Sequence, residues 1–443
     1  MHTILLSGGS GMRLWPLSGS LRSKMFLPLL PAPDGGTESM IGRVCRQLTQ
    51  AGLDESVLFV AHQDQLAITR RYTGNKFPVI GEPHKRGTFT AAAYGALHLY
   101  SAGKARPEDI ICVAPADMYA DEDFFRLFPQ FPDILASSQA ELLLLGTQPA
   151  YPSDQYGYIV PAQGGTEAYA QVLSFAEKPD IAKARELIEE QALWNCGVFA
   201  FRLSFLLSHL QRMGLPADHA AFAAQYAGLP VRSFDKEVAE HSTKAVVVRH
   251  KGEWSDLGSW DTLAARLDSP LTGEGGLWGE CRDTHIVNEL KVPLHVIGVP
   301  GIVAIASPEG ILVAARKEAN MIKDILQEHS VQLPRYGETG WGSYTLLDQA
   351  ANDSGLVLTI KLSLLPDHAL LEMPCLHSSK SWMVVSGHGE VVLNDSIAEA
   401  RTGEIFTMVR GDRHGVRAFN AMKLIEIRTL EEQDEDHYKI YDS

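Results

Sequence analysis

The chain has 443 residues, which is enough for two to three domains of about 150 residues each. Hydrophobic residues make up 45% and charged residues 21%, a composition that argues against a disordered, collagen-like or coiled-coil chain. The 54 acidic and 39 basic residues give a net charge of −15, so we expect no binding to nucleic acid or to an anionic membrane, and any phosphate site must be local.

Strands and helices are expected to alternate in the first half of the chain. Continuous apolar runs predict strands at Thr3–Leu6, Ser56–Ala61, Asp109–Ala114 and Glu141–Gly146. Helices are expected between them, at residues 39–51, 90–102 and 121–137. Because helical crossovers join parallel strands, this order predicts an α/β fold with a mostly parallel sheet covered on both faces. Binding sites are then expected at the carboxyl ends of the strands.

After about Leu267 the sequence pattern changes to short predicted strands separated by Gly and Pro residues. Strands are expected at residues 294–298, 302–306 and 311–315, followed by one helix near 320–329. The stretch 331–340 contains Pro334, Gly337 and Gly340 and has the composition of a linker. From Trp341 onward, alternating strands and turns predict a small all-β barrel or sandwich. We therefore expect three parts, spanning residues 1–267, 268–334 and 335–443.

Cysteine usage and the first residues indicate a cytoplasmic protein. The five cysteines are scattered and include no C-x-x-C pair, so neither a disulfide framework nor a zinc finger is expected. The N-terminus lacks the basic and long apolar regions of a signal peptide. Since no uninterrupted apolar run reaches about 18 residues, no membrane span is expected either.

A glycine-rich loop follows the first predicted strand directly. It contains Gly8, Gly9, Ser10, Gly11 and Met12. Glycines there let backbone N–H groups approach an anion, while Arg13 and Lys24 can neutralise phosphate oxygens. The loop matches neither the P-loop nor the dinucleotide-binding pattern, so by itself it could equally be a tight turn from strand to helix.

Seven short motifs, taken together in their order along the chain, favour a phosphate-binding loop over a tight turn. They are Leu6–Ser18 with Lys24–Leu27, Glu82–Thr88, Pro115–Asp117, Gly157–Ile159, Phe175–Pro179, Trp194–Gly197 and Trp254–Trp260. The set resembles the sugar-1-phosphate nucleotidyltransferases and is most similar to the mannose-1-phosphate guanylyltransferases. Ser23, Met25 and Gly87 depart from this family's usual Pro, Gln and Asn or Asp. None of the three departures removes a charged group from the phosphate site.

The resemblance implies a Rossmann-like domain of the GT-A type that converts GTP and mannose 1-phosphate to GDP-mannose and pyrophosphate. The implied catalytic residues are Arg13, Lys24, Asp117 and Asp256, of which Asp117 and Asp256 would hold one Mg²⁺. The implied nucleotide-binding residues are Gly8, Gly9, Ser10, Gly11, Met12, Glu82, Arg86 and Thr88. The implied residues for the sugar phosphate are Gly157, Glu177, Lys178 and Asn195. Because the attacking phosphate oxygen is already ionised, the site needs charge neutralisation and alignment rather than a general base.

Several alternatives to this assignment stay open at this point. Glu82 can accept from the N1–H and N2–H₂ groups of guanine, but backbone carbonyls could do the same. An arbitrary loop aspartate is more often a turn or N-cap residue than a metal ligand. The rival functions are a nucleotidyltransferase for another sugar 1-phosphate or nucleotide, a non-catalytic nucleotide-sugar sensor, and a bifunctional enzyme that also has mannose-6-phosphate isomerase activity. A homo-oligomer is compatible with the sequence.

The last hundred residues resemble the cupin domain that bifunctional relatives use for mannose-6-phosphate isomerisation. Trp341–Tyr344 resembles its opening, and Gly403, Gly411 and His414 resemble its second motif. The first motif differs, because Cys375, His377 and Lys380 stand where the family has His-x-His followed by Glu. A lysine adds positive charge where metal sites use His and carboxylate, so we expect a structural, assembly or regulatory module without isomerase activity. Cys375, His377 and His414 as a soft three-ligand site is the alternative.

Overall fold

The computed structural model describes residues 1–9, 11–19, 22–164, 166–328, 334–352, 355–372, 378–394, 396–431 and 441. The chain forms two compact units, Met1–Gly9 with Met25–Leu257, and Ser10–Lys24 with Gly258–Ser443. The boundary between the units therefore divides the glycine-rich loop, with Gly8 and Gly9 in the first unit and the residues from Ser10 onward in the second. The expected division at 267/268 and 334/335 stays a prediction.

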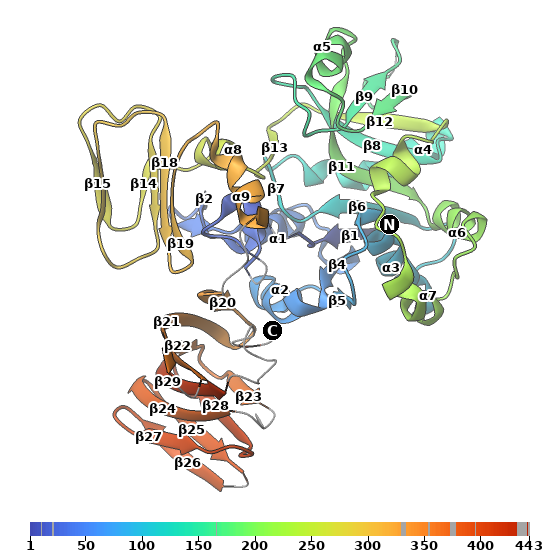
Figure 1. The fold of residues 1–443 in the computed structure, drawn as a ribbon. Helices are drawn as coiled ribbons and strands as arrows, with labels where there is room; N and C mark the ends of the chain where they lie inside the picture. The colour runs from blue at the N-terminus through green and yellow to red at the C-terminus, as the bar shows by residue number, and fades with distance from the viewer. Residues whose placement is uncertain are drawn as a thin grey trace. The chain divides into compact units, whose positions relative to one another are not determined.

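The first unit is built on a nine-stranded sheet (Figure 1). Its strands are β1 (His2–Leu6), β4 (Val57–His62), β5 (Val79–Glu82), β6 (Ile110–Pro115), β8 (Leu142–Thr147), β9 (Tyr158–Pro161), β10 (Ala170–Ala176), β11 (Leu193–Arg202) and β12 (Ala245–His250). The order in the sheet is β5-β4-β1-β6-β11-β8-β12-β10-β9. All four strands expected from apolar runs are present, with their ends within about one residue of the expected positions.

The direction of the strands differs between the two sides of this sheet. β5, β4, β1 and β6 are parallel, as expected, and so are β8 and β12. The remaining pairings are antiparallel. The sheet is mixed beyond β6 because the chain reverses direction between β9 and β10, so that β10 and β11 run antiparallel to the strands with which they pair.

Seven α-helices accompany the sheet within the described part of this unit. They are α1 (Met40–Gln50), α2 (Leu66–Tyr72), α3 (Thr88–Ser101), α4 (Phe131–Ser138), α5 (Ile181–Glu189), α6 (Leu203–Arg212) and α7 (His219–Gln225). The helix expected at 121–137 begins only at Phe131, after a 3₁₀ turn over Phe125–Gln130 that contains Pro129. A proline interrupts the α-helical hydrogen bonds, which explains the later start. α3 buries its small residues Ala92 and Ala96 in the same hydrophobic core as Ile4 and Val60 of the sheet.

Two short strand pairs complete the first unit. β2 (Leu30–Pro31) pairs with β3 (Thr37–Glu38), and β7 (Met118–Ala120) pairs with β13 (Trp254–Asp256). Across the described residues of both units, no helix is long and apolar enough to cross a membrane.

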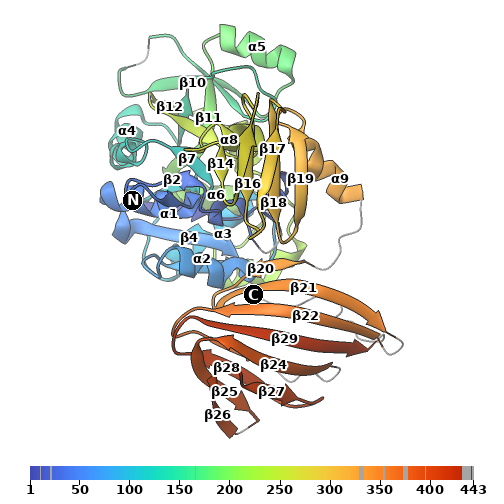
Figure 2. The same cartoon turned by 90° about the vertical axis from the view of Figure 1, so that its left-hand side faces the viewer.

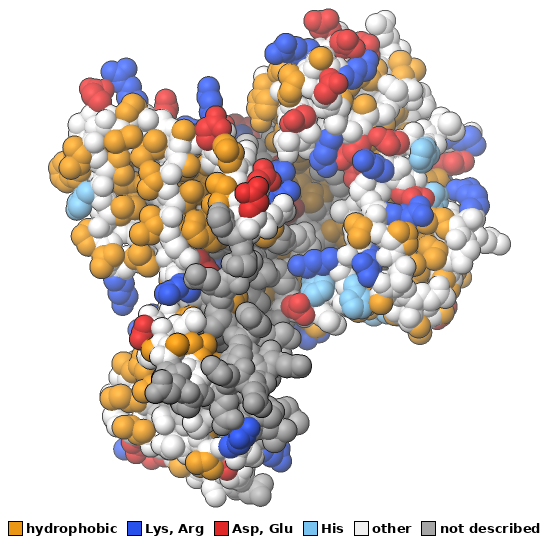
Figure 3. Space-filling view, viewed as in Figure 1, with side chains coloured by type: hydrophobic (Ala, Val, Ile, Leu, Met, Phe, Trp, Pro, Cys, Tyr) orange, Lys and Arg blue, Asp and Glu red, His pale blue; other side chains and the backbone are white. Residues whose placement is uncertain are grey.

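After Gly258 the second unit continues with short strands that form two sheets. β14 (Leu271–Thr272), β16 (His285–Asn288) and β18 (Ile302–Ser307) are parallel neighbours, β19 (Gly310–Ala315) is antiparallel to β18, and β15 (Gly275–Trp278) is parallel to β17 (Leu294–Ile297). α8 (Trp260–Ala264) and α9 (Ile322–Glu328) flank them in the sequence. Figure 3 shows hydrophobic side chains gathered over these strands. Exposed members are Trp278, Ile297, Ile311 and Val313.

The small all-β module expected at the C-terminal end is confirmed, and it consists of two antiparallel sheets (Figure 2). The first has the order β20 (Tyr336–Glu338), β21 (Gly342–Asn352), β22 (Gly355–Leu364), β29 (Met422–Glu431), β24 (Ser378–Ser386) and β27 (Ile405–Met408). The second has the order β23 (Ala369–Glu372), β28 (His414–Ala418), β25 (His388–Leu393) and β26 (Ser396–Arg401). Fully buried Ile360, Trp382 and Leu424 lie in its core. Part of the expected linker, Tyr336–Glu338, is a strand of this module.

Candidate active site

Glu82 and Gly8 lie together at the carboxyl ends of β5 and β1. A Cβ atom placed on Gly8 would be 3.7 Å from Oε1 of Glu82. The hydroxyl of Tyr226 donates to Oε2 of Glu82 over 2.5 Å. Burial raises the pKa of Glu82, and the hydrogen bond from Tyr226 opposes this rise. The structure thus holds one fixed carboxyl group beside the start of the glycine-rich loop.

Arg86 and Thr88 contact the chain segment at 226–234. Nε of Arg86 donates to the Tyr226 carbonyl over 3.4 Å, and its Nη2 donates to the Ala227 carbonyl. Oγ1 of Thr88 accepts from the backbone N–H of Phe234 over 2.8 Å. Both residues therefore hold this segment against the start of α3, and their expected contact with nucleotide stays a prediction.

Gly87, one of the departures from the family pattern, has a structural explanation. Its φ is +86°, and a Cβ atom there would lie 2.2 Å from the carbonyl oxygen of Arg232. The same backbone approach is seen in the hydrogen bond from the Arg232 N–H to the Arg86 carbonyl, at 3.0 Å. Only glycine fits this position without moving the 226–234 segment.

Asp117 and Asp256 occupy neighbouring positions of the β7–β13 pair. Asp117 immediately precedes β7, and Asp256, the last residue of β13, is the register partner of Met118. Both carboxylates are half-buried. The Ala116 N–H donates to the Leu6 carbonyl over 3.0 Å, which ties the turn at Asp117 to the end of β1. Two carboxylates supply the oxygen ligands that a divalent cation such as Mg²⁺ prefers.

The four residues expected to bind the sugar phosphate come together. A Cβ atom on Gly157 would lie 2.8 Å from Oε2 of Glu177 and 3.4 Å from Cβ of Asn195. The Asn195 N–H donates to the Gly157 carbonyl over 2.8 Å. Nζ of Lys178 is 2.7 Å from Oε1 of Glu177. These residues come from three different strand ends, so the fold and not local sequence assembles them.

Asp235 belongs to the same cluster, although no sequence motif indicated it. Its Oδ1 accepts from Nδ2 of Asn195 over 2.8 Å. Burial, together with the nearby charge of Glu177, raises the pKa of Asp235 to about 6. Tyr226 beside Glu82 was missed for the same reason, because neither residue lies in a recognisable motif.

Asp235→Asn is expected to change how stability depends on pH. Because the pKa of Asp235 is higher in the folded chain than its usual 3.8, this group favours the folded state most below about pH 4, and that contribution is lost as pH rises through about 6. Asparagine keeps an oxygen that can accept from Asn195 but does not ionise. We therefore compare the urea unfolding midpoints of the variant and of wild type at the two pH values. The midpoint of the variant minus that of wild type should be more positive at pH 7.5 than at pH 4.5.

The matched control for this test is Asp268→Asn, since Asp268 is exposed. It should show no difference between the two pH values. If Asp235→Asn changes the urea unfolding midpoint by the same amount at pH 4.5 and pH 7.5, the raised pKa of Asp235 is contradicted.

The glycine-rich loop closes on itself within the second unit. Gly11 has φ +60°, and a Cβ atom there would lie 3.0 Å from the backbone N of Lys24. Oγ of Ser18 donates to the Gly11 carbonyl over 2.5 Å. Met12–Leu14 form a 3₁₀ turn that carries a half-buried Arg13, and Lys24 is buried. Ser10 lies outside the described residues.

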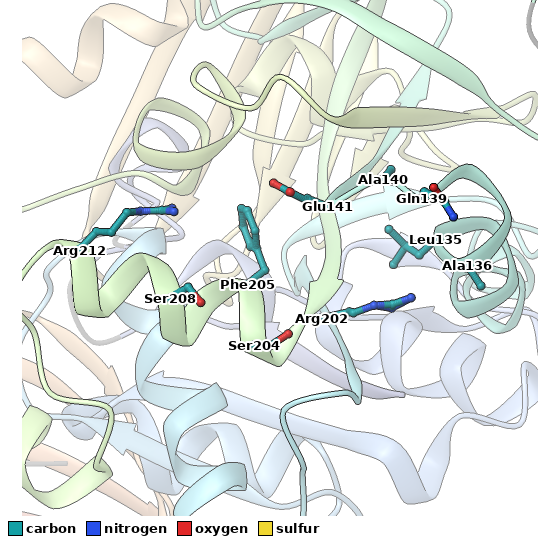
Figure 4. Close-up of a pocket in the computed structure, with 10 residues that line it drawn as sticks. All are labelled: Leu135, Ala136, Gln139, Ala140, Glu141, Arg202, Ser204, Phe205, Ser208 and Arg212. Atoms are coloured by element: carbon teal, nitrogen blue, oxygen red, sulfur yellow. The ribbon is translucent and has the colours of Figure 1, made fainter.

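Two cavities in the first unit lie away from the predicted residues. One, of about 550 Å³, is lined by residues of α4 and α6 and of the turns beside them, with Arg202 and Arg212 on either side of Phe205 (Figure 4). The other, of about 520 Å³, is lined mainly by residues of the β9–β10 turn and the end of β12. Neither contains a predicted site residue, so the candidate site is defined by the contacts given above.

Lys380 and His414 are both buried inside the C-terminal module. Near them Glu426, also buried, accepts from Nε1 of Trp382 over 2.7 Å and lies 2.8 Å from Nη2 of Arg428. Burial alone would raise the pKa of Glu426, but the charges of Arg428 and Lys380 hold it below its usual value. Cys375 and His377 lie outside the described residues.

Comparisons with known proteins cover most of the chain. The sequence model of the nucleotidyl transferase family matches residues 2–268. The chain is 26% identical over 432 residues to the alginate biosynthesis protein AlgA of Pseudomonas putida, covering 90% of this chain and 86% of that protein. It is 26% identical over 462 residues to a mannose-1-phosphate guanylyltransferase of Sinorhizobium fredii, covering 96% and 88%. A crystal structure described as "mannose-1-phosphate geranyltransferase" from Thermus thermophilus is 29% identical, with a TM-score of 0.61 and coverage of 74% and 98%.

Proposed function

The chain belongs to the nucleotidyl transferase family, and from this premise we propose that it transfers the guanylyl group of GTP to mannose 1-phosphate. The products are GDP-mannose and pyrophosphate. The observation that carries the proposal is the pairing of β7 with β13, which brings Asp117 and Asp256 to neighbouring positions from distant parts of the sequence. The similarity to a mannose-1-phosphate guanylyltransferase over 96% of the chain supports the choice of substrates.

The residues supply positioning and charge neutralisation. Asp117 and Asp256 would hold Mg²⁺, which would supply positive charge for the reacting phosphates. Arg13 and Lys24 neutralise phosphate oxygens of the nucleotide. A phosphate oxygen of mannose 1-phosphate attacks the α-phosphorus of GTP, the bond from the α-phosphorus to the bridging oxygen breaks, and pyrophosphate leaves. Because the attacking oxygen is already ionised, no side chain has to remove a proton.

The two substrates are recognised by separate groups of side chains. Glu82 accepts from the N1–H and N2–H₂ groups of guanine, and Tyr226 fixes its carboxyl group in place. Backbone N–H groups of Gly8 to Met12 approach the phosphates, with Arg86 and Thr88 beside the base. Gly157, Glu177 and Asn195 hold the sugar hydroxyls, while Lys178 binds the phosphate of the sugar.

A substrate panel tests the specificity. Pyrophosphate release is measured with each of GTP, ATP, UTP and dTTP, combined with mannose, glucose, galactose and N-acetylglucosamine 1-phosphates. We expect the highest kcat/KM for GTP with mannose 1-phosphate, at least about 10-fold above every other pair, since a pyrimidine lacks the paired donors that Glu82 would bind. A higher kcat/KM with UTP or dTTP would reassign the enzyme to another nucleotide sugar.

Three further features are part of the proposal. The C-terminal module carries no isomerase activity, because Lys380 is buried with Glu426 and Arg428 where a metal ligand is needed. A homo-oligomer is supported by the exposed apolar strand residues around Trp278 and Ile311. A reducing cytoplasm suits an enzyme that uses GTP and whose described cysteines are all free thiols.

A further inference from the structure

The glycine-rich loop continues through residues 13–19 and 22–24, and this longer loop is fixed in place by side chains that lie far from it in the sequence. Nε1 of Trp260 donates to the Trp15 carbonyl over 3.1 Å, and Oγ of Ser307 donates to the Pro16 carbonyl over 2.7 Å. A Cβ atom on Gly310 would lie 2.6 Å from the Trp15 ring, so β19 approaches the loop closely. The side of the loop that carries Trp15 and Pro16 is thus held by residues of the second unit.

Arg22 adds a charged anchor at the other end of the loop. Its Nη1 donates to both carboxylate oxygens of Glu289 at 2.9 Å, and its Nε is 2.9 Å from Oε1 of Glu338. The guanidinium also lies 5.3 Å from the ring centre of Tyr336, whose hydroxyl donates to the same Glu338 oxygen over 3.0 Å. Only 9% of the Arg22 side chain is exposed. The planar guanidinium is suited to binding two carboxylates at once, and a lysine is not.

A chain of contacts leads from Arg22 to Lys24, one of the residues that we propose to bind phosphate. The Gly19 N–H donates to the Arg22 carbonyl over 2.9 Å. Ser18, next to Gly19, donates to the Gly11 carbonyl, and Gly11 abuts Lys24. Lys24 itself is only two residues from Arg22. A displacement of Arg22 would therefore move both ends of the loop that carries Arg13 and Lys24.

We propose that Arg22 is a positioning residue for nucleotidyl transfer, which ties the glycine-rich loop to Glu289 and, through Glu338 of β20, to the C-terminal all-β module. The inference rests on the proposed function for the reaction that it serves. In this proposal the C-terminal module supports catalysis by holding the loop in position, and none of its own residues takes part in the reaction. In-line attack depends on the placement of phosphate-binding groups to within about 1 Å, so loss of the anchor should lower kcat more than it raises KM for GTP.

The test compares Arg22→Met and Arg22→Lys in the full chain with the control Arg282→Met. Arg282 is an exposed arginine of the same unit that pairs with the exposed carboxylate of Glu280. We expect Arg22→Met to lower kcat by at least about 10-fold, Arg22→Lys to restore only part of the loss because one ammonium group cannot replace the two-sided contact, and Arg282→Met to match wild type. Hydrogen exchange of the backbone amides of residues 11–19 should be faster in Arg22→Met than in the control.

Two results would overturn the inference. One is a lower melting temperature for Arg22→Met with unchanged kcat, which would show a purely structural role. The other is unchanged exchange of the loop amides, which is a readout that needs no substrate. If wild type itself is inactive with GTP and mannose 1-phosphate, the proposed function fails, and the exchange experiment still decides the role of Arg22.

If Arg22→Met does not fold, Glu338→Gln takes its place. This variant keeps the side-chain volume and leaves Arg22 paired with Glu289, and it should show the same direction of change in kcat and in loop exchange. Wild-type values for both measurements in Glu338→Gln would remove the C-terminal module from the proposal.

Discussion

Asp117→Asn and Asp256→Asn are each expected to lower kcat for pyrophosphate release by at least about 100-fold. Each change removes one negative charge from the pair that would hold Mg²⁺, while the side-chain volume stays nearly the same. The two residues are half-buried neighbours on the β7–β13 pair, and the amide variants preserve the backbone pairing of these strands. The loss should therefore appear in catalysis and not in the melting temperature.

The measurement is the initial rate at saturating GTP and mannose 1-phosphate over a range of Mg²⁺ concentrations, with thermal unfolding in parallel. Asp123→Asn is the matched control, since Asp123 is an exposed aspartate of the same unit that pairs with Arg126. We expect the control to keep wild-type kcat and the two site variants to need more Mg²⁺ for their residual rate. A near-wild-type rate in either site variant would remove that residue from the metal site.

Gly87→Asn is expected to destabilise the fold strongly, although asparagine is one of the family's usual residues there. At φ +86° a Cβ atom would lie 2.2 Å from the carbonyl oxygen of Arg232, so the 226–234 segment would have to move. Backbone strain and the displaced segment together should cost about 3 kcal/mol or more of the free energy of unfolding. The melting temperature should fall by about 6 °C or more.

Gly103→Asn provides the comparison, because Gly103 also has a positive φ of +68° but no atom lies within 4 Å of its Cβ position. Its free energy of unfolding should change by less than about 1 kcal/mol. If Gly87→Asn unfolds at the wild-type temperature, the close approach of Arg232 does not determine the residue at position 87.

Apolar runs predicted the strands of the first unit well, because a buried strand needs an unbroken hydrophobic segment whatever its neighbours are. Val57–His62 and Leu142–Thr147 both lie within about one residue of the expected positions. Strand direction was less predictable. It depends on how each connection is made, and the reversal between β9 and β10 made β10 and β11 antiparallel to the strands with which they pair.

The motif residues were predicted from the sequence, but their supporting partners were not. Tyr226 and Asp235 hold Glu82 and Asn195, yet they lie in a segment without a motif and reach their partners only through the tertiary fold. Arg22 was missed for the same reason, since both of its carboxylate partners are more than 250 residues away. Contacts of this kind leave no local pattern of hydrophobic or charged residues.

Product balance in the reaction of GTP with mannose 1-phosphate tests the proposed nucleotidyl transfer most directly. The purified 443-residue chain is incubated with both substrates. GTP, GDP-mannose and pyrophosphate are quantified by ion-exchange chromatography with Mg²⁺, with excess chelator, and with Mg²⁺ restored. We expect one GDP-mannose and one pyrophosphate for each GTP consumed, loss of both products in chelator, and recovery with Mg²⁺. Undiminished turnover in excess chelator, or consumption of GTP without formation of GDP-mannose, would contradict the proposal.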